Sequence, residues 1–526
     1  MTVIIFALFT VTAVADALPY PMITLREAPF GYTPVTNAEE FRSMTTDGHY
    51  ILLSDIDLSG ETTVPLGNDD TPFTGTFDGN GHKLSGALIS GNYKYSALFG
   101  KLENATIKNL IVENITVQNN ADESEELPDE LYAAGIAAFA KGSVIRNCSV
   151  SGTISANAAS FAYAGGIAAY IDDTDMKDLA NYASVGANSK SFAYSAGICA
   201  YLRNGCRVES VLNSGSLSGL SEGVYIGGIA AYAKNDNIKT TVINAKNTAD
   251  ITAEVEEERA AYTVAGILAA GPCNAERVYN SGNIKIRSTL GVTVGGILGN
   301  SSHSSVSRAV NCGNVSVVAG ADANAGGIYA VSIYSEVTDA INSGDLYASG
   351  KSSGYAGGIS SQSRSRSSYV NVINLGNISG DGNVGSISGK SCDFGNRFND
   401  TFANVYAKAS AISAIGSGSF SDACTILSDS ELADPSKLKG LDFESTWTFN
   451  SDGIPTLTIV KTVSKPEPIL GDADGDGDIS LADFTRMCRS IAGWNDTEII
   501  EANCDFNGDG VFDTVDTLLL MRMLIK

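Results

Sequence analysis

The sequence predicts a mainly β protein, a parallel β-solenoid followed by a small α-helical module. Three observations carry this prediction. A segment that ends in Gly-Gly-Ile, or in a close variant of it, recurs nine times, and its isoleucines keep a nearly constant spacing. A second, asparagine-containing segment keeps step with it through most of the repeats. Two similar acidic stretches of twelve residues, Asp472–Asp483 and Asp505–Asp516, follow near the end of the chain.

The chain begins with an apolar run over residues 3–15, and the small residues of Ala15-Asp16-Ala17 end it. This length and this small-residue exit predict a secretory signal peptide over residues 1–17. The basic stretch that usually precedes such a run is missing, since the first Lys or Arg is Arg26. The alternative is a buried N-terminal strand.

Residues 18–97 are expected to form an N-terminal cap and the first β-helix turns. Asn37 stands directly before Ala38-Glu39-Glu40, which is the signature of a capped, short helix. The remaining residues alternate between polar and apolar like strands, and Asp78-Gly79-Asn80-Gly81 predicts a tight turn between two of them.

Residues 98–390 hold the repeats. Each unit has two or three runs of four to six small or β-branched residues divided by Gly, Asn and Ser, which predicts strands and turns. A unit of about 31 residues suits one coil of a solenoid, in which like residues stack at about 4.8 Å. A β-propeller is the competing architecture, but its blades need four strands in about 40 residues.

Stacking of the coils predicts several ladders of like residues. An internal aliphatic ladder is expected at Ile136, Ile167, Ile198 and Ile229. A ladder of turn residues in the left-handed conformation is expected at Asn147, Asn213, Asn280, Asn311, Asn342 and Asn374.

Two aromatic ladders are also expected. They comprise Tyr132, Tyr163, Tyr194 and Tyr225, and Phe139, Tyr170, Tyr201 and Tyr232. The two ladders are seven residues apart, so strict alternation predicts opposite faces, with one ladder inside and the other outside. Rings at rung spacing either stiffen the solenoid by stacking or offer a strip on which sugars stack. Tyr170, Tyr201 and Tyr232 are the candidate glycan-stacking residues.

Two intervals between repeats are longer than the others and contain acidic insertions, at 122–130 and 254–258. Insertions in a solenoid emerge as loops. These acids lack the alternation of a calcium loop, so a solvated charge run is preferred to a cation or partner site. Residues 391–460 lose the repeat and gain aromatic residues, which predicts a cap on the open end of the solenoid. Residues 461–469, with two prolines, are expected to be a stiff linker.

The acidic stretches near the end of the chain have the spacing of calcium-binding loops. Ca²⁺ takes six to eight oxygen ligands, and alternate positions of a curled twelve-residue loop deliver them. Gly477 and Gly510 stand at the sixth position, where the chain must turn sharply. The predicted ligands are Asp472, Asp474, Asp476, Asp478 (backbone carbonyl), Ser480 and Asp483, and Asp505, Asn507, Asp509, Val511 (backbone carbonyl), Asp513 and Asp516. Helices are expected over Leu481–Ala492 and Thr514–Ile525.

Composition excludes several classes of function. The formal net charge of −25 argues against nucleic acid or anionic lipid as a partner. No stretch after the N-terminus has the roughly 18–20 apolar residues of a membrane span. The nine cysteines match no zinc or disulfide framework, and the three histidines do not form an HExxH motif. Asp78 and His82 are the nearest approach to a catalytic cluster, but a turn explains them better, so the catalytic residues are unknown.

Residues 470–526, with their paired calcium loops, resemble a type I dockerin. That family docks enzymes or binding proteins onto a cohesin of a bacterial scaffoldin. The resemblance implies two Ca²⁺ ions, a secreted or surface-bound cellulosome component and an anaerobic bacterial source. Export by an anaerobe is compatible with unpaired cysteines. It also implies cohesin contacts at Leu481, Ala482, Cys488 and Arg489 in one copy and Thr514, Val515, Met521 and Arg522 in the other. The two sets differ, which argues against interchangeable docking in two orientations.

Residues 36–460 resemble the GLUG-motif family of extracellular bacterial proteins, which implies a right-handed parallel β-helix without catalytic residues of its own. The leading hypothesis is a secreted, non-catalytic cellulosome subunit that binds carbohydrate or a surface, or acts as a spacer. The alternative is an enzyme, a polysaccharide lyase or glycoside hydrolase on a parallel β-helix. A weaker third reading is adhesion to host or neighbouring cells.

Overall fold

The computed structural model describes residues 25, 27–91, 93–118, 127–234, 238–255, 260–392, 399–409, 412–418, 424–458, 471, 473, 479–492, 499, 501–504 and 512–524. The chain divides into two compact units. One comprises residues 25–459, and the other comprises residues 1–24 and 460–526. The predicted signal peptide and linker lie outside the described residues.

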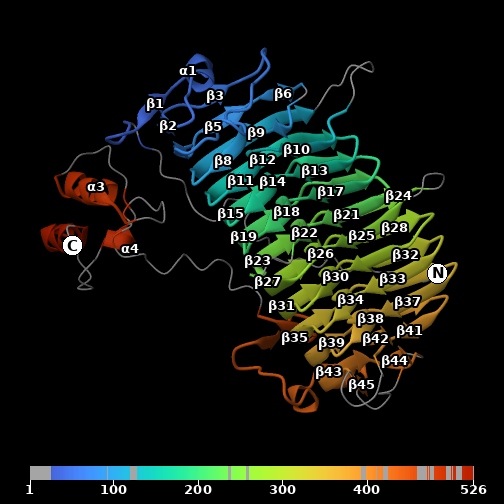
Figure 1. The fold of residues 1–526 in the computed structure, drawn as a ribbon. Coiled ribbons are helices and arrows are strands. Elements are labelled where there is room, and N and C mark those ends of the chain that lie inside the picture. Colours follow the sequence, from blue (N-terminus) through green and yellow to red (C-terminus); the bar gives the residue numbers. More distant parts are fainter. Residues whose placement is uncertain are drawn as a thin grey trace, which may run out of the picture. The chain divides into compact units, whose positions relative to one another are not determined.

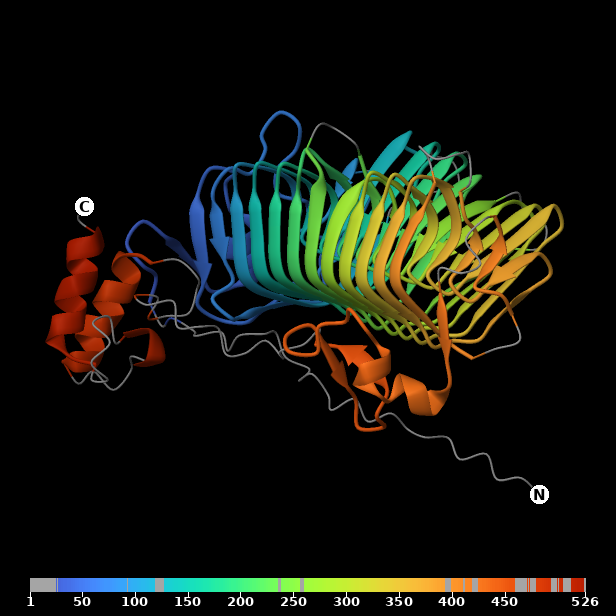
Figure 2. The same cartoon turned by 90° about the horizontal axis from the view of Figure 1, so that it is seen from below.

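The unit of residues 25–459 is a parallel β-solenoid (Figures 1 and 2). One rung runs through β13 (Phe161–Gly165), β14 (Ala168–Asp172), β15 (Asp175–Asn181) and β16 (Ser184–Asn188). Each strand pairs in parallel with its equivalent in the next rung, and Tyr163, for example, pairs with Tyr194. One rung has about 31 residues, which is the sequence separation of the hydrogen-bonded pair Asn280 and Asn311. This length lies within the usual range of solenoid repeats. The predicted parallel solenoid is confirmed, and the propeller is excluded.

The strands stack into three parallel sheets, here called A, B and C. Sheet C contains β7 (Tyr95–Ser96), β10 (Glu130–Ala134), β13, β17 (Phe192–Ala196), β21 (Gly223–Gly227), β25 (Ala261–Ala265), β29 (Val292–Gly295), β33 (Asp322–Gly326), β37 (Ser353–Gly357) and β41 (Asn383–Gly385). Sheet B contains β8 (Phe99–Glu103), β11 (Ala137–Lys141), β14, β18 (Cys199–Arg203), β22 (Ala230–Ala233), β26 (Leu268–Ala270), β30 (Leu298–Ser302), β34 (Tyr329–Ile333), β38 (Ser360–Ser365), β42 (Ser388–Lys390) and β44 (Ile415–Ser417).

Sheet A forms the rest of each rung and bends between two columns of strands, such as those of β15 and β16. Its remaining strands are β1 (Thr33–Val35), β2 (His49–Leu52), β3 (Ile56–Asp57), β4 (Thr76–Asp78), β5 (Lys83–Ser85), β6 (Leu88–Ser90), β9 (Thr106–Gln118), β12 (Val144–Asn157), β19 (Arg207–Asn213), β20 (Leu217–Leu220), β23 (Thr240–Asn247), β24 (Ile251–Glu254), β27 (Cys273–Asn280), β28 (Ile284–Ser288), β31 (Ser305–Asn311), β32 (Val315–Ala319), β35 (Glu336–Asn342), β36 (Leu346–Gly350), β39 (Ser368–Asn374), β40 (Ile378–Gly380), β43 (Thr401–Lys408) and β45 (Thr425–Leu427).

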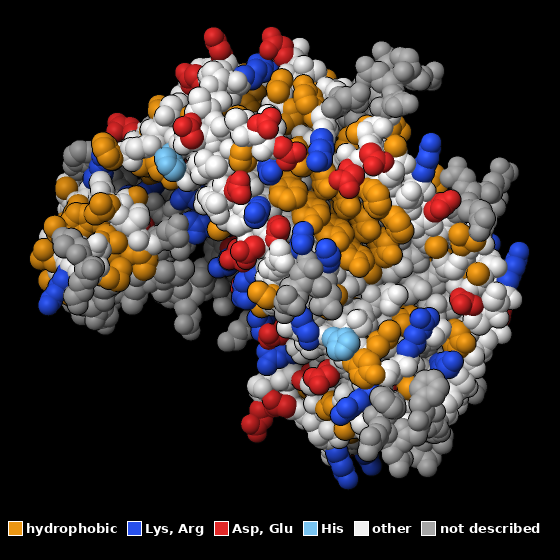
Figure 3. Space-filling view, in the orientation of Figure 1, with side chains coloured by type: hydrophobic (Ala, Val, Ile, Leu, Met, Phe, Trp, Pro, Cys, Tyr) orange, Lys and Arg blue, Asp and Glu red, His pale blue; other side chains and the backbone are white. Residues whose placement is uncertain are grey.

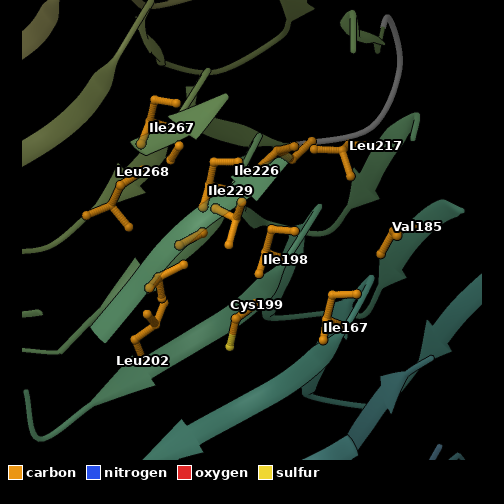
Figure 4. Packing of buried hydrophobic residues seen from close by; sticks show 14 of the residues in the cluster. Ile167, Val185, Ile198, Cys199, Leu202, Leu217, Ile226, Ile229, Ile267 and Leu268 are labelled. Carbon is orange, nitrogen blue, oxygen red and sulfur yellow. The ribbon is translucent and has the colours of Figure 1, made fainter. Parts of the chain in front are cut away.

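The interior is filled by stacked aliphatic side chains. Ile136, Ile167, Ile198 and Ile229 are fully buried in one core cluster, so the predicted internal ladder is confirmed. Figure 4 shows the last three of these side chains in a row, followed by Ile267 from the next rung. Because neighbouring rungs repeat isoleucine at this position, each of these side chains packs against a copy of itself.

A second internal ladder consists of asparagine side chains at the bend of sheet A. From Asn181 to Asn342, each amide nitrogen donates to the side-chain oxygen of the asparagine in the next rung at 2.8–2.9 Å, and each residue is buried. The members are Asn181, Asn213, Asn247, Asn280, Asn311, Asn342 and Asn374. This asparagine ladder satisfies polar groups that would otherwise be costly to bury.

The prediction for these asparagines was wrong in two respects. Among them only Asn147 has a left-handed backbone, with φ of 50°, and it belongs to a different column of sheet A. The other five predicted members do not have a positive φ; they use their side chains, while the left-handed column passes through Asn147, Asp178 and Ser210. Asn181 and Asn247 are members that the sequence pattern missed.

The asparagine ladder explains the second glycine of the Gly-Gly-Ile segment. A Cβ atom added to Gly166 would lie 2.3 Å from Cγ of Asn181 and 2.1 Å from the carbonyl oxygen of Gly197. The same conflict recurs in later rungs, for example between Gly266 and Asn280. The two repeated motifs therefore keep step because they touch each other across the interior.

The predicted N-terminal helix and tight turn are both confirmed. Helix α1 (Ala38–Arg42) starts at Asn37, whose side-chain oxygen accepts the backbone N–H of Glu40 at 3.0 Å. The chain turns sharply between β4 and β5, where Asn80 and Gly81 both have positive φ.

Residues 428–458 form a small lobe on the side of the solenoid. The lobe comprises α2 (Asp429–Leu432), the 3₁₀ helix η1 (Pro435–Lys437) and the antiparallel pair β46 (Trp447–Phe449) and β47 (Pro455–Leu457). We expected a cap on the open end, but the lobe packs on outward-facing residues of sheet A, such as Val310 and Ile341 (Figure 2). Trp447 is buried there and donates its Nε1–H to Asp339 at 3.0 Å.

In the C-terminal unit the structure describes three helices, α3 (Leu481–Ile491), α4 (Glu501–Cys504) and α5 (Thr514–Leu524). The two predicted helices are confirmed, while α4 was not predicted. Met487 and Leu520 pack in the core of this unit together with Ala473 and Cys504. None of the described helices meets the length and hydropathy needed to cross a membrane.

Candidate functional site

The described ends of the two acidic loops have the same geometry. Asp483 and Asp516, the predicted twelfth ligands, are fully buried in the first turns of α3 and α5. Oδ2 of Asp483 accepts the backbone N–H of Ser480 at 2.7 Å, and Oδ2 of Asp516 accepts that of Asp513 at 2.8 Å. A carboxylate at a helix N-terminus is stabilised by the unpaired N–H groups there.

This arrangement fits a calcium ion chemically. A fully buried carboxylate needs a hydrogen-bonded or cationic partner, and all the predicted ligands are hard oxygen donors of the kind that Ca²⁺ prefers. The predicted ligands Asp472, Asp474, Asp476, Asp478, Asp505, Asn507, Asp509 and Val511 lie outside the described residues.

The predicted partner-contacting residues lie on α3 and α5, and their larger apolar side chains are exposed. Leu481 is 66% exposed, Val515 47% and Met521 39%. Leu518, which the sequence reasoning missed, is 64% exposed. Val515, Leu518 and Met521 are three residues apart and therefore share one face of α5. An apolar helix face of this kind is typical of a protein-docking surface.

Comparison with known proteins identifies this unit. Residues 470–525 match the dockerin type I domain model. The dockerin indicates cellulosome-type binding to a cohesin, and type I dockerins are in general calcium-binding. No curated protein matches the chain. One similar solved structure is that of a Bacteroides ovatus protein provisionally described as an immunoglobulin A1 protease. It is 14% identical with a TM-score of 0.35, and the match covers 81% of this chain and 92% of the other; at that level it supports no inference about function.

Outside the dockerin, the most prominent surface is the pair of aromatic ladders. Both are in register, on sheets C and B respectively. Ring centroids within each ladder are 4.8–5.1 Å apart, with nearly parallel planes. The sheet C ladder begins one rung earlier, with Tyr95. We call these rings the aromatic face; it consists of Tyr95, Tyr132, Tyr163, Tyr194, Tyr225, Phe139, Tyr170, Tyr201 and Tyr232.

The two ladders do not lie on opposite faces, so that expectation was wrong. Tyr163 meets Tyr170 edge to face at 6.2 Å, and both belong to a cluster separate from the internal core. The physical reason is the bend at Gly165-Gly166-Ile167, which interrupts strict alternation and turns the outer faces of sheets C and B toward each other. Figure 3 shows the aromatic face as the broad hydrophobic patch near the middle of the view.

The stacking geometry limits what most of these rings can bind. Parallel rings with centroids about 5 Å apart are too close to lie side by side in one plane, so they overlap face to face. Tyr170 and Tyr201 therefore turn edges, not faces, to the solvent. Burial raises the pKa of Tyr132, Tyr163 and Tyr194, as expected for hydroxyls on a packed ladder. The face-to-face ring contacts therefore agree with the interpretation that the aromatic ladders stiffen the solenoid.

A column of charged residues lies on sheet A in the early rungs. Asp78, Lys108, Arg146, Lys177 and Glu209 occupy equivalent positions in successive strands. Lys108 Nζ lies 3.7 Å from Asp78 Oδ2, and both side chains are largely buried. His82 instead pairs with Asp55, its Nδ1 lying 3.0 Å from Asp55 Oδ1.

Beside this column, Asp178 interrupts a chain of side-chain hydrogen bonds. Asn109 donates to Asp78 and Asn147 donates to Asn109, which leaves the Asn147 oxygen facing the next rung. That rung carries Asp178, which is 7% exposed. Within the described part of the chain, neither Asn147 Oδ1 nor Asp178 Oδ1 has a hydrogen-bond partner. These two buried oxygen acceptors lie on adjacent rungs, and a hydrogen bond between them would require one of them to carry a proton.

A protonated Asp178 would supply that missing proton. Burial, with a smaller contribution from Glu209, raises the pKa of Asp178 to about 6, although Lys177, Arg146 and a hydrogen bond from Ser210 all act to lower it. Because the folded-state pKa lies above the unfolded value, this residue stabilises the fold at acidic pH, and its contribution is lost as the pH rises through 6.

We expect Asp178→Asn to continue the hydrogen-bond chain at every pH. Its amide can donate to Asn147 Oδ1, so the variant should be about 2 kcal/mol more stable than the native chain at pH 8 and should lose most of that advantage at pH 4. Urea denaturation at both pH values measures the difference. Equal shifts at pH 4 and pH 8 would contradict the protonation account.

Proposed function

We propose that this protein is a secreted cellulosome component that attaches to a scaffoldin through a calcium-dependent dockerin. The observation that carries the proposal is the dockerin match over residues 470–525, together with the two loops whose described ends share one geometry. In this proposal each of the two loops holds one Ca²⁺ ion, and Asp483 and Asp516 complete the two sets of ligands. Calcium supplies the charge that the buried carboxylates require, and the chain positions α3 and α5 for the cohesin.

The partner-contacting residues follow from the same proposal. They are Leu481, Ala482, Cys488 and Arg489 on α3, and Thr514, Val515, Met521 and Arg522 on α5. The exposed apolar row of Val515, Leu518 and Met521 supports α5 as the principal docking helix. The corresponding positions on α3 are Ala482, Thr485 and Cys488, which are smaller or more polar.

For the solenoid we propose a non-catalytic role in binding carbohydrate or in spacing and display. Support comes from sheets B and C, whose outward columns bear rings, amides and hydroxyls over most of their length. The charged column of sheet A, with Asp78, Lys108 and Arg146, is the observation that keeps a second candidate open, a polysaccharide lyase or glycoside hydrolase. Such enzymes need closely placed acidic and basic groups.

One experiment addresses both parts. The full-length protein is applied to an immobilised type I cohesin and, separately, to a panel of polysaccharides scored for retention and for released products. We expect cohesin binding in calcium that chelator abolishes, and polysaccharide retention without product. Product release that Asp78→Asn removes would instead establish the enzyme, and no cohesin binding in calcium would refute the attachment.

A further inference from the structure

The aromatic face ends abruptly partway along the solenoid. In the rung after Tyr225 the equivalent residue is Thr263, and in the rung after Tyr232 it is Ala270. Rings within each ladder overlap face to face, so each inner ring has both faces covered by its neighbours. Tyr225 and Tyr232, as the last rings, have no ring stacked on the side of the following rung, where only the smaller side chains of Thr263 and Ala270 lie. They also meet each other edge to face, at 5.6 Å and 84°.

Beyond these two rings the next three rungs carry smaller residues at the same positions. Sheet C has Thr263, Thr293 and Asn324, and sheet B has Ala270, Asn300 and Val331. We call these six residues the floor. Figure 3 shows polar surface beside the hydrophobic patch, over the rungs that contain the floor.

The floor carries a fixed set of polar groups. The Asn324 amide donates to Thr293 Oγ1 at 3.3 Å, and its oxygen accepts from Gln362 Nε2 at 2.5 Å. Asn324 and Gln362 are both more than nine-tenths buried, whereas Asn300 is exposed. Their mutual hydrogen bonds hold the buried amides in place, so the floor is preorganised.

Larger side chains return in the rung after the floor; we call Tyr225 with Tyr232, and Tyr355 with Gln362, the two walls. Tyr355 follows Asn324 on sheet C, Gln362 follows Val331 on sheet B, and the Lys390 ammonium lies 5.8 Å from the Tyr355 ring centroid. Adjacent rungs are about 4.8 Å apart, so the four steps from Tyr225 to Tyr355 span roughly 19 Å. The two outward columns therefore carry smaller residues between the rings of Tyr225 and Tyr232 and the ring of Tyr355, and we call this stretch the trough.

The chemistry of the trough points to an uncharged ligand. The structure describes every residue of the two outward columns between Tyr225 and Tyr355. None of the six floor residues in this stretch has a charged side chain. The chain as a whole has a net charge of −25, which repels polyanions. The rings of Tyr225 and Tyr232, the exposed Asn300 amide and the threonine hydroxyls of the floor together suit a ligand with alternating apolar faces and hydroxyl groups, which is the chemistry of a sugar chain.

We propose that the trough binds a short stretch of an uncharged polysaccharide, with Tyr225 and Tyr232 stacking on one sugar and Asn300 and Thr293 contacting the next. The proposal rests on the proposed carbohydrate-binding role of the solenoid. It assigns recognition to the end of the ladders, whereas the candidate residues Tyr170 and Tyr201 serve to stiffen the ladder.

The test compares two tyrosines of one ladder in the full-length protein. Affinity electrophoresis measures binding to uncharged polymers (xyloglucan, glucomannan, mixed-linkage β-glucan) and to polygalacturonate. We expect retention by at least one uncharged polymer, and a loss of about tenfold or more in Tyr232→Ala. The matched control Tyr170→Ala should bind within about twofold of the native chain, although it removes two stacking contacts and so lowers the melting temperature more.

Several results would overturn the proposal. Equal losses in both variants would return recognition to the whole ladder, and retention by polygalacturonate alone would refute the charge argument. No retention by any polymer, or concentration-dependent self-association that Tyr232→Ala removes, would refute the site as such. Binding to immobilised cohesin, measured on the same samples, shows whether the attachment proposal stands when this one fails.

Discussion

Replacing Asn280 by alanine should lower the free energy of unfolding of the solenoid by about 3 kcal/mol or more. The Asn280 amide donates to Asn311 Oδ1 at 2.8 Å and to the Gly282 carbonyl at 3.0 Å, and its oxygen accepts from Asn247. Alanine leaves the Asn311 oxygen buried without a donor and opens a cavity beneath Gly266. Urea denaturation followed by the β-sheet circular dichroism signal measures the loss.

The same rung supplies a matched control. The Asn283 side chain also bonds to both neighbouring rungs, donating its amide to Asp250 and accepting the backbone N–H of Asn314, but these bonds are exposed to solvent. Water can replace its partners, so Asn283→Ala should cost no more than about 1 kcal/mol. Similar losses in the two variants would show that the buried asparagine ladder has no special part in holding the rungs together.

Replacing Met521 by glutamate should weaken cohesin binding by about a hundredfold or more. Met521 is exposed on the face of α5 that also presents Val515 and Leu518, and a buried, unpaired carboxylate at a docking interface is strongly unfavourable. Surface plasmon resonance on an immobilised cohesin in calcium gives the affinity.

Met523 provides the control for this experiment. It is 41% exposed, close to the 39% of Met521, but two residues along a helix place it on a different face. Met523→Glu should therefore bind within about threefold of the native chain, with the same melting temperature as Met521→Glu. If Met521→Glu binds normally while Cys488→Glu does not, the first copy and not the second is the docking helix.

The periodic part of the fold was predictable because parallel stacking makes sequence spacing equal to spatial register. Ile136, Ile167 and Ile198 recur at equal spacing and are buried in one ladder, and Tyr163 pairs with Tyr194 as that spacing requires. The helices after the two acidic loops were predictable as well, because capping residues and loop templates act locally. Ser480 caps α3 in this way, accepting the N–H of Ala482 at 3.1 Å.

What sequence reasoning missed depends on how the chain bends. The bend at Gly166 brings two ladders of odd separation onto one outer face, which strict alternation forbids. The asparagine ladder was partly misaligned because Asn147 and Asn213 look alike in sequence but occupy different columns. The side-on packing of residues 428–458 rests on contacts such as Trp447 to Asp339, 108 residues apart, for which no local signal exists. The trough follows only once the two sheets are known to face each other.

Hydrogen exchange of the full-length protein, with calcium and with chelator, tests most directly whether metal orders the docking unit. We predict slow amide exchange across α3 and α5 in calcium, rapid exchange there in chelator, and unchanged protection throughout the solenoid. Equal protection of α3 and α5 in both conditions would contradict calcium-dependent attachment.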